Sequence, residues 1–147
     1  MIYVFTGNGK GKTSAAIGMA VRAVGAGEKV LMVQFLKDGK SSEIKAIKKI
    51  KNFDIRQEKD LNFLEKTAKR KYNLVILDEV NVAMKFGLLG VKEVSDILKQ
   101  YRKKPDLVLT GRWCPKEIIK MADLVTELKE IKHYYKKGVK AKRGREY

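Results

Sequence analysis

The sequence predicts an α/β fold in three layers, with a mostly parallel central sheet covered by helices on both faces. Short apolar segments alternate with helix-like segments along all 147 residues, which is typical of parallel strands joined by crossover helices. The segment Lys29–Leu36 is almost continuously apolar, as a strand buried on both faces would be. Because this length suits one folding unit with a sizeable core, we expect a single domain over residues 1–147.

The expected elements follow one another in a regular order. Strands are expected at Ile2–Phe5, Lys29–Leu36, Phe53–Gln57, Leu74–Leu77, Leu107–Thr110 and Leu124–Leu128. Helices are expected at Ser14–Val24, Ser42–Ile50, Leu61–Lys71, Val91–Tyr101 and Pro115–Met121. Gly25 fits a helix end, Ser42 fits an N-cap and Pro115 suits a first helical turn. A basic tail follows the last strand.

The composition is strongly basic, with 33 Lys and Arg against 17 Asp and Glu and a net charge of +16. Such a charge attracts nucleic acids, nucleotides or anionic membrane surfaces. The basic residues cluster at Lys45, Lys48, Lys49 and Lys51; at Lys66, Lys69, Arg70 and Lys71; and at Lys136, Lys137, Lys140, Lys142, Arg143 and Arg145. We favour a solvated, lysine-rich surface over a nucleic-acid groove, because aromatic residues accompany the charges only near Tyr134 and Tyr135.

Several classes of protein are disfavoured by the sequence. The longest apolar run, Val30–Phe35, is far shorter than the roughly 20 residues that span a bilayer, and Met1–Phe5 lacks the basic start of a signal peptide. Cys114 is the single cysteine and His133 the single histidine, which argues against a disulfide framework and a zinc site. We therefore expect a cytoplasmic protein with no membrane association.

The segment 6–13 reads TGNGKGKT and lies between the first strand and the first helix. It resembles a phosphate-binding loop, whose glycines let backbone amides surround phosphate oxygens at the positive end of a helix. Lys12 would reach the outer phosphates and the Thr13 hydroxyl would hold Mg²⁺. The usual pattern has glycine where this chain has Thr6. A glycine-rich turn without a ligand is the alternative, and the placement of Lys12 and Thr13 between strand and helix disfavours it.

Two acidic residues, Asp78 and Glu79, directly follow the apolar strand Leu74–Leu77. This pattern places carboxylates beside the metal, at the carboxyl edge of the sheet. In an ATPase, the second acid commonly orients the attacking water. A simple cap of the next element is the alternative for this pair, and the phosphate-binding loop makes it the weaker one.

Two arginines are ambiguous on spacing alone. Arg112 follows the strand Leu107–Thr110, and Arg22 lies on the helix that leaves the loop. For each, a phosphate contact and a plain surface position fit equally well. The residues taken alone thus indicate a P-loop protein that uses a magnesium nucleotide.

A set of motifs along the chain is similar to the ATP:cob(I)alamin (corrinoid) adenosyltransferase family of the CobA/BtuR type. The matching segments are Gly7–Thr13, Ala15–Ala20, Arg22–Gly25, Val33–Phe35, Ile76–Asn81, Leu109–Arg112, Ala122–Glu127, Ile131–His133 and Gly138–Ala141, with Gly144 and Glu146–Tyr147. The resemblance covers nearly the whole chain in one order. It implies a RecA-like P-loop NTPase fold in which the Thr110 strand lies between the loop strand and the Asp78 strand.

The resemblance also implies the reaction, in which the Co(I) of a reduced corrinoid attacks the 5′-carbon of ATP and expels tripolyphosphate. Because Co(I) is already a strong nucleophile, no protein nucleophile or general base is required. The implied catalytic residues are Lys12, Thr13 and Glu79, and the implied metal site is Thr13, Asp78 and Glu79. The implied nucleotide-binding residues are Gly7, Asn8, Gly9, Lys10, Gly11, Lys12, Thr13, Ser14, Arg22 and Arg112.

On this reading, charge that builds on the leaving triphosphate is stabilised by loop amides, by Lys10, Lys12 and Arg22, and by Mg²⁺. Glu79 then serves the metal site and does not activate water. The family resemblance further implies a homodimer and a flavodoxin-like reductant that delivers Co(I).

The chain departs from the family at four places. The loop strand begins at residue 2, without the N-terminal extension that covers the corrinoid in many members. The segment Leu36–Tyr72 is shorter than in the family. Phe63 is the one candidate aromatic stand-in near cobalt, and its helical spacing with Leu61 and Leu64 fits a core position equally well. Trp113 and Cys114 stand where small residues are usual, and Lys142 and Arg145 stand where glutamine and isoleucine are usual. Two alternatives stay open: a small RecA-like ATPase or nucleic-acid-binding protein, and a relative that binds ATP or corrinoid without catalysis.

Overall fold

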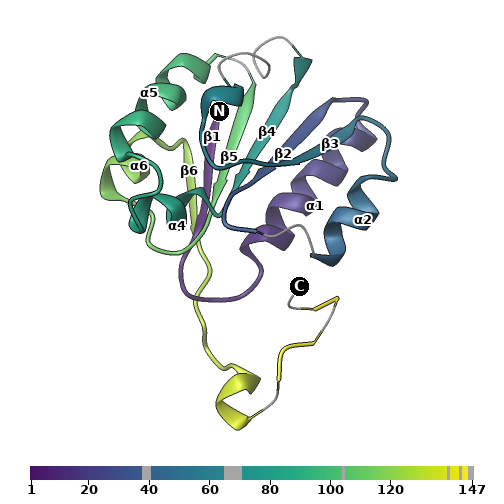
Figure 1. Ribbon diagram of the computed structural model, residues 1–147, viewed down its shortest axis with the longest axis vertical. Helices are drawn as coiled ribbons and strands as arrows, with labels where there is room; N and C mark the ends of the chain where they lie inside the picture. The colour runs from purple at the N-terminus through teal and green to yellow at the C-terminus, as the bar shows by residue number, and fades with distance from the viewer. Residues whose placement is uncertain (38–40, 65–70, 104, 139, 143, 146–147) are drawn as a thin grey trace.

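Parallel β-strands form the centre of the computed structural model, which describes residues 1–37, 41–64, 71–103, 105–138, 140–142 and 144–145. The sheet has six strands in the order β3-β2-β4-β5-β1-β6, and every neighbouring pair is parallel (Figure 1). The strands are β1 (Ile2–Thr6), β2 (Val30–Gln34), β3 (Phe53–Gln57), β4 (Leu74–Asp78), β5 (Asp106–Thr110) and β6 (Leu124–Glu127). The predicted position of the Thr110 strand, between the loop strand and the Asp78 strand, is confirmed.

Helices cover both faces of this sheet and complete the three predicted layers (Figure 1). The helices are α1 (Lys12–Gly25), α2 (Ser42–Ile47), α4 (Val80–Lys85), α5 (Val91–Tyr101), α6 (Lys116–Met121) and the short 3-10 helix η1 (Tyr134–Lys137). Helices α1 and α2 pack on one face, and α4, α5 and α6 pack on the other. In the part of the chain that is described, no helix has both the length and the apolar character needed to cross a bilayer.

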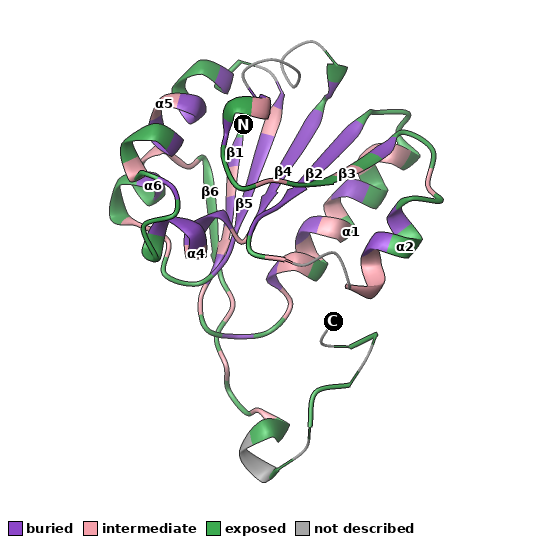
Figure 2. Cartoon of the chain, in the orientation of Figure 1, coloured by how far each residue is buried: buried purple, intermediate pink, exposed green. Residues whose placement is uncertain are grey.

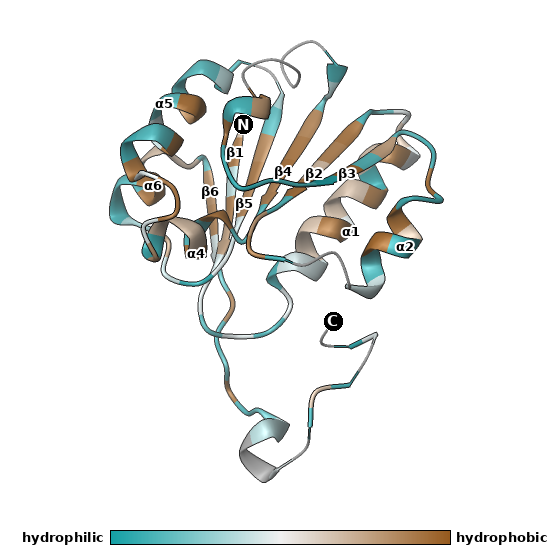
Figure 3. Cartoon of the chain, in the orientation of Figure 1, coloured by the Kyte–Doolittle hydropathy of each residue, from teal (hydrophilic) through white to brown (hydrophobic). Residues whose placement is uncertain are grey.

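The alternation of side chains along the central strands builds two cores. Val30 and Met32 of β2 pack with Ala16 and Ala20 of α1 on one face. Leu31 and Val33 of the same strand pack on the opposite face, with residues of α4, α5 and α6. Successive residues of a strand point to opposite faces, so a strand covered on both sides must be apolar throughout. Figures 2 and 3 show the same central strands as buried and hydrophobic.

The predicted elements other than the helix at Leu61–Lys71 are present, several of them with shifted ends. Helix α1 begins at Lys12 and not at Ser14, because the loop passes directly into the helix after Gly11. The predicted helix Ser42–Ile50 ends at Ile47, and β2 is shorter than the predicted Lys29–Leu36. Most of the helix predicted at Leu61–Lys71 lies outside the described residues, as do Lys66, Lys69, Arg70 and Arg143 of the basic clusters. The lysines predicted on the surface at 45, 48, 49 and 51 are exposed.

Two elements were not predicted. Helix α4 follows the acids of β4 immediately, and four of its six residues are buried, so it lacks the polar stripe of an amphipathic helix. The predicted basic tail contains η1, and beyond it the chain turns back so that Gly144 and Arg145 lie near the start of α2. Helix α4 is placed by contacts with β5 and the buried core, which local periodicity does not encode.

Candidate active site

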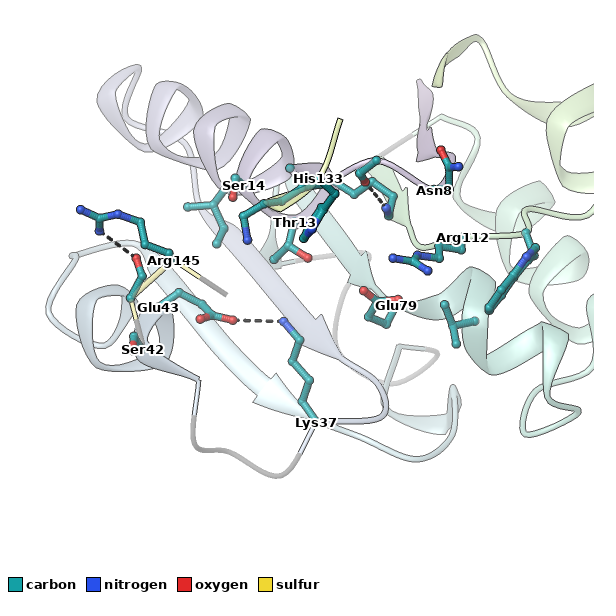
Figure 4. Close-up of a pocket in the computed structure, with 18 residues that line it drawn as sticks. Asn8, Thr13, Ser14, Lys37, Ser42, Glu43, Glu79, Arg112, His133 and Arg145 are labelled. Atoms are coloured by element: carbon teal, nitrogen blue, oxygen red, sulfur yellow. Dashed lines mark hydrogen bonds and ion pairs between the residues drawn. The ribbon is translucent and has the colours of Figure 1, made fainter. Parts of the chain in front are cut away.

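A cavity of about 740 Å³ lies at the carboxyl edge of the sheet, where α1 begins (Figure 4). Its walls come from the loop after β1, from the starts of α1 and α2, and from the segments after β4 and β5. Ligands of open parallel sheets bind at this edge. The predicted site residues that line the cavity are Asn8, Gly9, Lys10, Gly11, Lys12, Thr13, Ser14, Glu79 and Arg112.

The loop between β1 and α1 needs glycine for its shape. Gly7 and Gly11 have φ angles of 98° and 109°, a conformation that other residues rarely adopt. A Cβ atom on Gly7 would lie 2.4 Å from the carbonyl oxygen of Leu128. That same oxygen accepts a hydrogen bond of 2.7 Å from the amide of Gly9. The loop is therefore fixed against the residue that follows β6, and Gly7 belongs to this support and not to the cavity wall.

Lys12 lies at the centre of the loop. It is buried, and its Nζ donates a hydrogen bond of 2.6 Å to the carbonyl oxygen of Gly9. Burial and the nearby Arg112 lower the Lys12 pKa, although the Glu79 carboxylate opposes them. The result is a poorly solvated ammonium held over the loop at the amino end of a helix, which favours the binding of an anion.

Asp78 ties together three elements that are distant in the sequence. Its carboxylate is fully buried, and its Oδ1 accepts hydrogen bonds from the Thr13 hydroxyl at 2.8 Å and the Thr110 hydroxyl at 2.7 Å. The Thr110 hydroxyl in turn accepts a hydrogen bond of 3.0 Å from the amide of Glu79. The structure thus brings Thr13 and Asp78, two residues of the predicted metal site, into direct contact. Asp78 acts from beneath the cavity, since its carboxylate is not among the lining groups.

The second oxygen of Asp78 belongs to a polar cluster at the end of β2. Its Oδ2 lies 2.9 Å from Lys37 Nζ and 3.2 Å from Gln34 Nε2. Both nitrogens also reach Glu43 Oε1 of α2, each at 3.1 Å. Sequence reasoning assigned no role to Lys37 or Glu43. The available signal was Gln34, a polar residue at the end of an otherwise apolar strand.

Glu79 has an unusual backbone and an unusual environment. Its φ angle is 63°, the left-handed region, at the junction between β4 and α4. Burial raises the Glu79 pKa, and the adjacent Asp78 raises it further, against the opposing effect of Lys37, Lys12 and Arg112. The carboxylate lies on the same side of the cavity as Arg112 (Figure 4). A strained, desolvated carboxylate facing a cavity is suited to a cation that a ligand brings with it.

Of the other predicted site residues, Asn8 lies at the cavity and Arg22 lies away from it. Asn8 lines the cavity and also anchors the tail, because its Oδ1 accepts a hydrogen bond of 3.0 Å from the amide of Glu130. Arg22 is exposed on α1, ten residues beyond Lys12 and thus about 15 Å along the helix axis, and it does not line the cavity. His133 and Arg145, for which the sequence gave no definite role, do line it.

Phe63, the aromatic stand-in suggested by the sequence, lies against the core. It packs beside the buried cluster under α4 and α5, and its ring lies 4.4 Å from the guanidinium of Arg56. It lines none of the cavities described here. The position therefore favours the packing alternative for Phe63.

The oxygen atoms at the site fit Mg²⁺. Thr13, Asp78 and Glu79 offer one hydroxyl and two carboxylates, which are hard oxygen donors. Among the described residues, no three His, Cys, Asp or Glu side chains gather into a metal-binding group. Mg²⁺ commonly binds through one or two carboxylates together with substrate phosphates. The donor set thus fits a metal ion that arrives with a nucleotide.

Apolar side chains form a rim next to this cavity. The apolar rim, as defined here, comprises the exposed residues Leu36, Phe86, Leu88 and Trp113. Phe86 and Trp113 meet edge to face with ring centroids 6.1 Å apart. Leu36 and Leu88 line a second cavity of about 610 Å³, and Lys37 lines both cavities, so the two adjoin. Exposed apolar groups gathered beside a polar cavity are typical of a binding surface.

Comparison with known proteins identifies relatives over the full length of the chain. The corrinoid adenosyltransferase of Escherichia coli strain K12 is 36% identical over 167 residues, which cover 100% of this chain and 85% of the relative. Corrinoid adenosyltransferase CobA of Salmonella typhimurium is 33% identical with the same coverage. The corrinoid adenosyltransferase of Pseudomonas aeruginosa is 33% identical and is covered to 83%. Because 167 positions exceed the 147 residues of this chain, the E. coli relative has residues within the matched region that this chain lacks.

Among solved structures, domain III of the Thermotoga maritima replication initiation protein DnaA is similar with a TM-score of 0.46 and 17% identity. The similarity covers 86% of this chain and 53% of that one. The sequence profile described as ATP:corrinoid adenosyltransferase BtuR/CobO/CobP matches residues 1–69 and 56–147. The family predicted from the motifs is thus confirmed, and the chain belongs to the ATP:corrinoid adenosyltransferases.

Proposed function

We propose that this chain transfers the 5′-deoxyadenosyl group of ATP to the Co(I) of a reduced corrinoid and releases tripolyphosphate. The observation that carries the proposal is the contact of Thr13 with Asp78 at 2.8 Å below a loop that holds Lys12, in a chain of this family. The Co–C bond forms at the ribose 5′-carbon as the bond from that carbon to the triphosphate oxygen breaks. The electron pair of that bond leaves with the triphosphate.

The cavity residues are suited to hold the triphosphate as a leaving group. Lys10, Lys12 and Arg112 line the cavity and supply positive charge around it. Thr13, Asp78 and Glu79 would hold Mg²⁺, and Asp78 also accepts a hydrogen bond from the Thr13 hydroxyl. Bound Mg²⁺ would neutralise charge that develops on the leaving triphosphate. Arg22 is too far along α1 for this role within one chain, and it is not part of the proposal.

The protein needs no nucleophile of its own in this reaction, since Co(I) attacks carbon directly. The one cysteine, Cys114, is half-buried near the site, and burial raises its pKa to about 12. Its thiol therefore stays protonated at neutral pH and is a poor nucleophile. This is consistent with a site that positions its substrates and supplies no nucleophile of its own.

The apolar rim offers a docking surface for the corrinoid. The corrin ring is broad and largely apolar, and the rim adjoins the phosphate cavity through Lys37. A macrocycle on the rim would thus lie beside the nucleotide. Trp113→Ala and Leu88→Ala are expected to raise the Kd for cobalamin by about tenfold each, the usual effect of removing a central apolar contact. The Kd for ATP should stay unchanged, as should both constants in Val21→Ala, which removes an exposed apolar side chain from α1.

The direct test of the function is an anaerobic assay with chemically reduced cobalamin, MgATP and the purified protein. We expect a light-sensitive alkylcobalamin spectrum with the wild-type protein and none with Lys12→Ala. A wild-type protein that binds ATP but leaves the cobalamin spectrum unchanged would contradict the proposal. The choice between cobalamin and a precursor corrinoid follows from repeating the assay with each.

Two further features of the family resemblance are proposed for this chain, a homodimer and a flavodoxin-like reductant. The edge strand β6 exposes Leu124 and Val125, which offers apolar surface to a second copy. A net charge of +16 would attract an acidic electron-transfer protein. Sedimentation equilibrium of the wild type and Val125→Lys tests the dimer, and replacing the chemical reductant with reduced flavodoxin tests the partner.

A further inference from the structure

One ammonium group at the end of β2 lies between two carboxylates of the active site. Lys37 Nζ is 2.9 Å from Asp78 Oδ2. It is also 3.1 Å from Glu43 Oε1, as the dashed line in Figure 4 marks. Asp78 is fully buried, and the side chains of Lys37 and Glu43 are each 22% exposed. Lys37 also lines the cavity that contains Lys12 and Thr13. The cluster therefore places a cation on the carboxylate that supports the proposed metal site.

In this arrangement both carboxylate oxygens of Asp78 already have partners, so another cation cannot bind them. Its Oδ1 is taken by the hydroxyls of Thr13 and Thr110, and its Oδ2 by Gln34 and Lys37. Burial alone would lower the Lys37 pKa, but the Asp78 and Glu43 carboxylates outweigh it and raise the pKa. The lysine is thus charged at neutral pH. A divalent ion can approach Asp78 Oδ2 only when the ammonium of Lys37 leaves.

An unsatisfied oxygen in the same cluster points to another state of the site. Gln34 is buried, and its Oε1 has no hydrogen-bond partner within the described ranges. Buried acceptors without a partner are rare in folded proteins. The amide nitrogen of the same side chain contacts both carboxylates, so this oxygen belongs to the cluster. It can accept a hydrogen bond from water bound to a metal ion, or from a rearranged Lys37.

We propose that Lys37 exchanges partners when the metal nucleotide binds: its ammonium group moves away from the Asp78 and Glu43 carboxylates and pairs with the triphosphate. A divalent ion near Asp78 would repel the ammonium of Lys37, and a triphosphate bound in the same cavity would offer that ammonium another anionic partner. Lys37 is then a phosphate-binding residue that reaches the cavity from the segment after β2, in addition to Lys12 of α1. The inference rests on the proposed function, because it requires a metal ion beside Thr13 and Asp78.

The exchange has a consequence for how the metal enters. In the nucleotide-free protein Lys37 neutralises the carboxylates, and a free divalent ion gains little there. With ATP present, the triphosphate supplies both ligands for the metal and a new partner for Lys37. The metal ion is therefore expected to bind together with the nucleotide and only weakly before it.

The test measures binding of Mn²⁺ to the nucleotide-free protein by electron paramagnetic resonance, without corrinoid. Lys37→Met is expected to bind Mn²⁺ at least tenfold more tightly than the wild type, because two carboxylates lose their counter-ion. Lys37→Arg keeps the charge and should bind Mn²⁺ as weakly as the wild type. Lys45→Met, which removes an exposed lysine of α2, is the matched control and should not change the affinity.

The second measurement is binding of inorganic tripolyphosphate in the presence of Mg²⁺, by isothermal titration calorimetry. Lys37→Met should weaken it by at least tenfold, and Lys45→Met should leave it unchanged. An unchanged result for Lys37→Met in either measurement overturns the exchange. If Lys37→Met does not fold, the double variant Lys37→Met/Glu43→Gln is compared with Glu43→Gln alone. The glutamine removes one of the two carboxylates that would otherwise lack a counter-ion.

Asp78→Asn separates this inference from the proposed function. If the metal site is correct, Asp78→Asn abolishes the Mn²⁺ affinity gained by Lys37→Met when the two are combined. If the double variant keeps that affinity, the metal site itself is wrong. If Asp78→Asn weakens binding of Mg²⁺-ATP while Lys37→Met changes nothing, the metal site stands and the exchange alone is overturned.

Discussion

At the scale of the residue, Glu79 has two features that are energetically unfavourable in the folded protein. Its backbone adopts a left-handed conformation, and its carboxylate is desolvated beside Asp78. Strain of this kind persists where the surrounding structure imposes it, and it is concentrated at functional sites. The glycine at 111 permits the arrangement, since a Cβ there would lie 3.2 Å from Glu79 Oε2 and 3.0 Å from Asn81 Cβ.

Glu79→Gln is expected to stabilise the nucleotide-free protein and to impair catalysis. The folded-state pKa of Glu79 is raised, so ionisation above its unfolded value of 4.5 disfavours folding. At pH 7 the variant should therefore unfold at a temperature a few degrees higher than the wild type. The difference should shrink as the pH falls and vanish below about 4.5, where the carboxyl group is protonated in both the folded and the unfolded state. A variant that is less stable at pH 7 by differential scanning calorimetry would contradict this reading.

At the scale of the element, the loop after β1 depends on the strand at the opposite end of the sequence. Gly9 and Gly7 both lie against Leu128, which directly follows β6. The sequence predicted the loop from its glycines, and it predicted the last strand. It did not show that one supports the other, because that contact joins residues about 120 positions apart and leaves no local pattern.

Gly7→Ala is expected to destabilise the protein and to weaken ATP binding together. The added Cβ would meet the Leu128 carbonyl at 2.4 Å, and the φ angle of 98° is unfavourable for alanine. We expect a loss of about 2 kcal/mol or more in the free energy of unfolding. The matched control is Gly18→Ala in α1, which has open space around it and should add up to about 1 kcal/mol. Urea denaturation compares the two, and equal effects would contradict the proposed support.

The pattern of apolar and polar residues predicted some of the helices and strands and missed others. The strands were found because their burial makes them apolar, and α5 was found at its observed ends, Val91–Tyr101, because one face is polar. Helix α4 was missed because it is buried on most sides. Motifs predicted Thr13, Asp78 and Glu79 as candidate site residues, whereas Lys37 and Glu43, which lie beside them, carry no such motif. Their role comes from the packing of α2 against the end of β2, which the sequence does not display.

At the scale of the whole molecule, strand order brings the site together. Thr13, Asp78 and Thr110 are tens of residues apart, and they meet because β4, β5 and β1 are neighbours in a parallel sheet. The net charge of +16 is another whole-molecule property. The lysines at 45, 48, 49 and 51 are exposed, and this supports a solvated surface.

We expect the charge to give only weak, salt-sensitive binding to DNA. A non-specific Kd of about 10⁻⁴ to 10⁻⁶ M is typical at physiological salt, and it should rise steeply with further salt. Fluorescence anisotropy with a labelled duplex at several salt concentrations measures this. ATP turnover that is stimulated by DNA would favour the alternative of a nucleic-acid-dependent ATPase.

The central claim is that the triphosphate leaves ATP as one piece when the 5′-carbon is transferred. Phosphorus NMR of a single turnover, with excess protein, limiting MgATP and reduced cobalamin, tests it most directly. The account predicts one tripolyphosphate for each adenosylcobalamin formed, with no ADP. Accumulation of ADP and orthophosphate without an alkylcobalamin would contradict it, because the site would then cleave the terminal phosphate as an ATPase does.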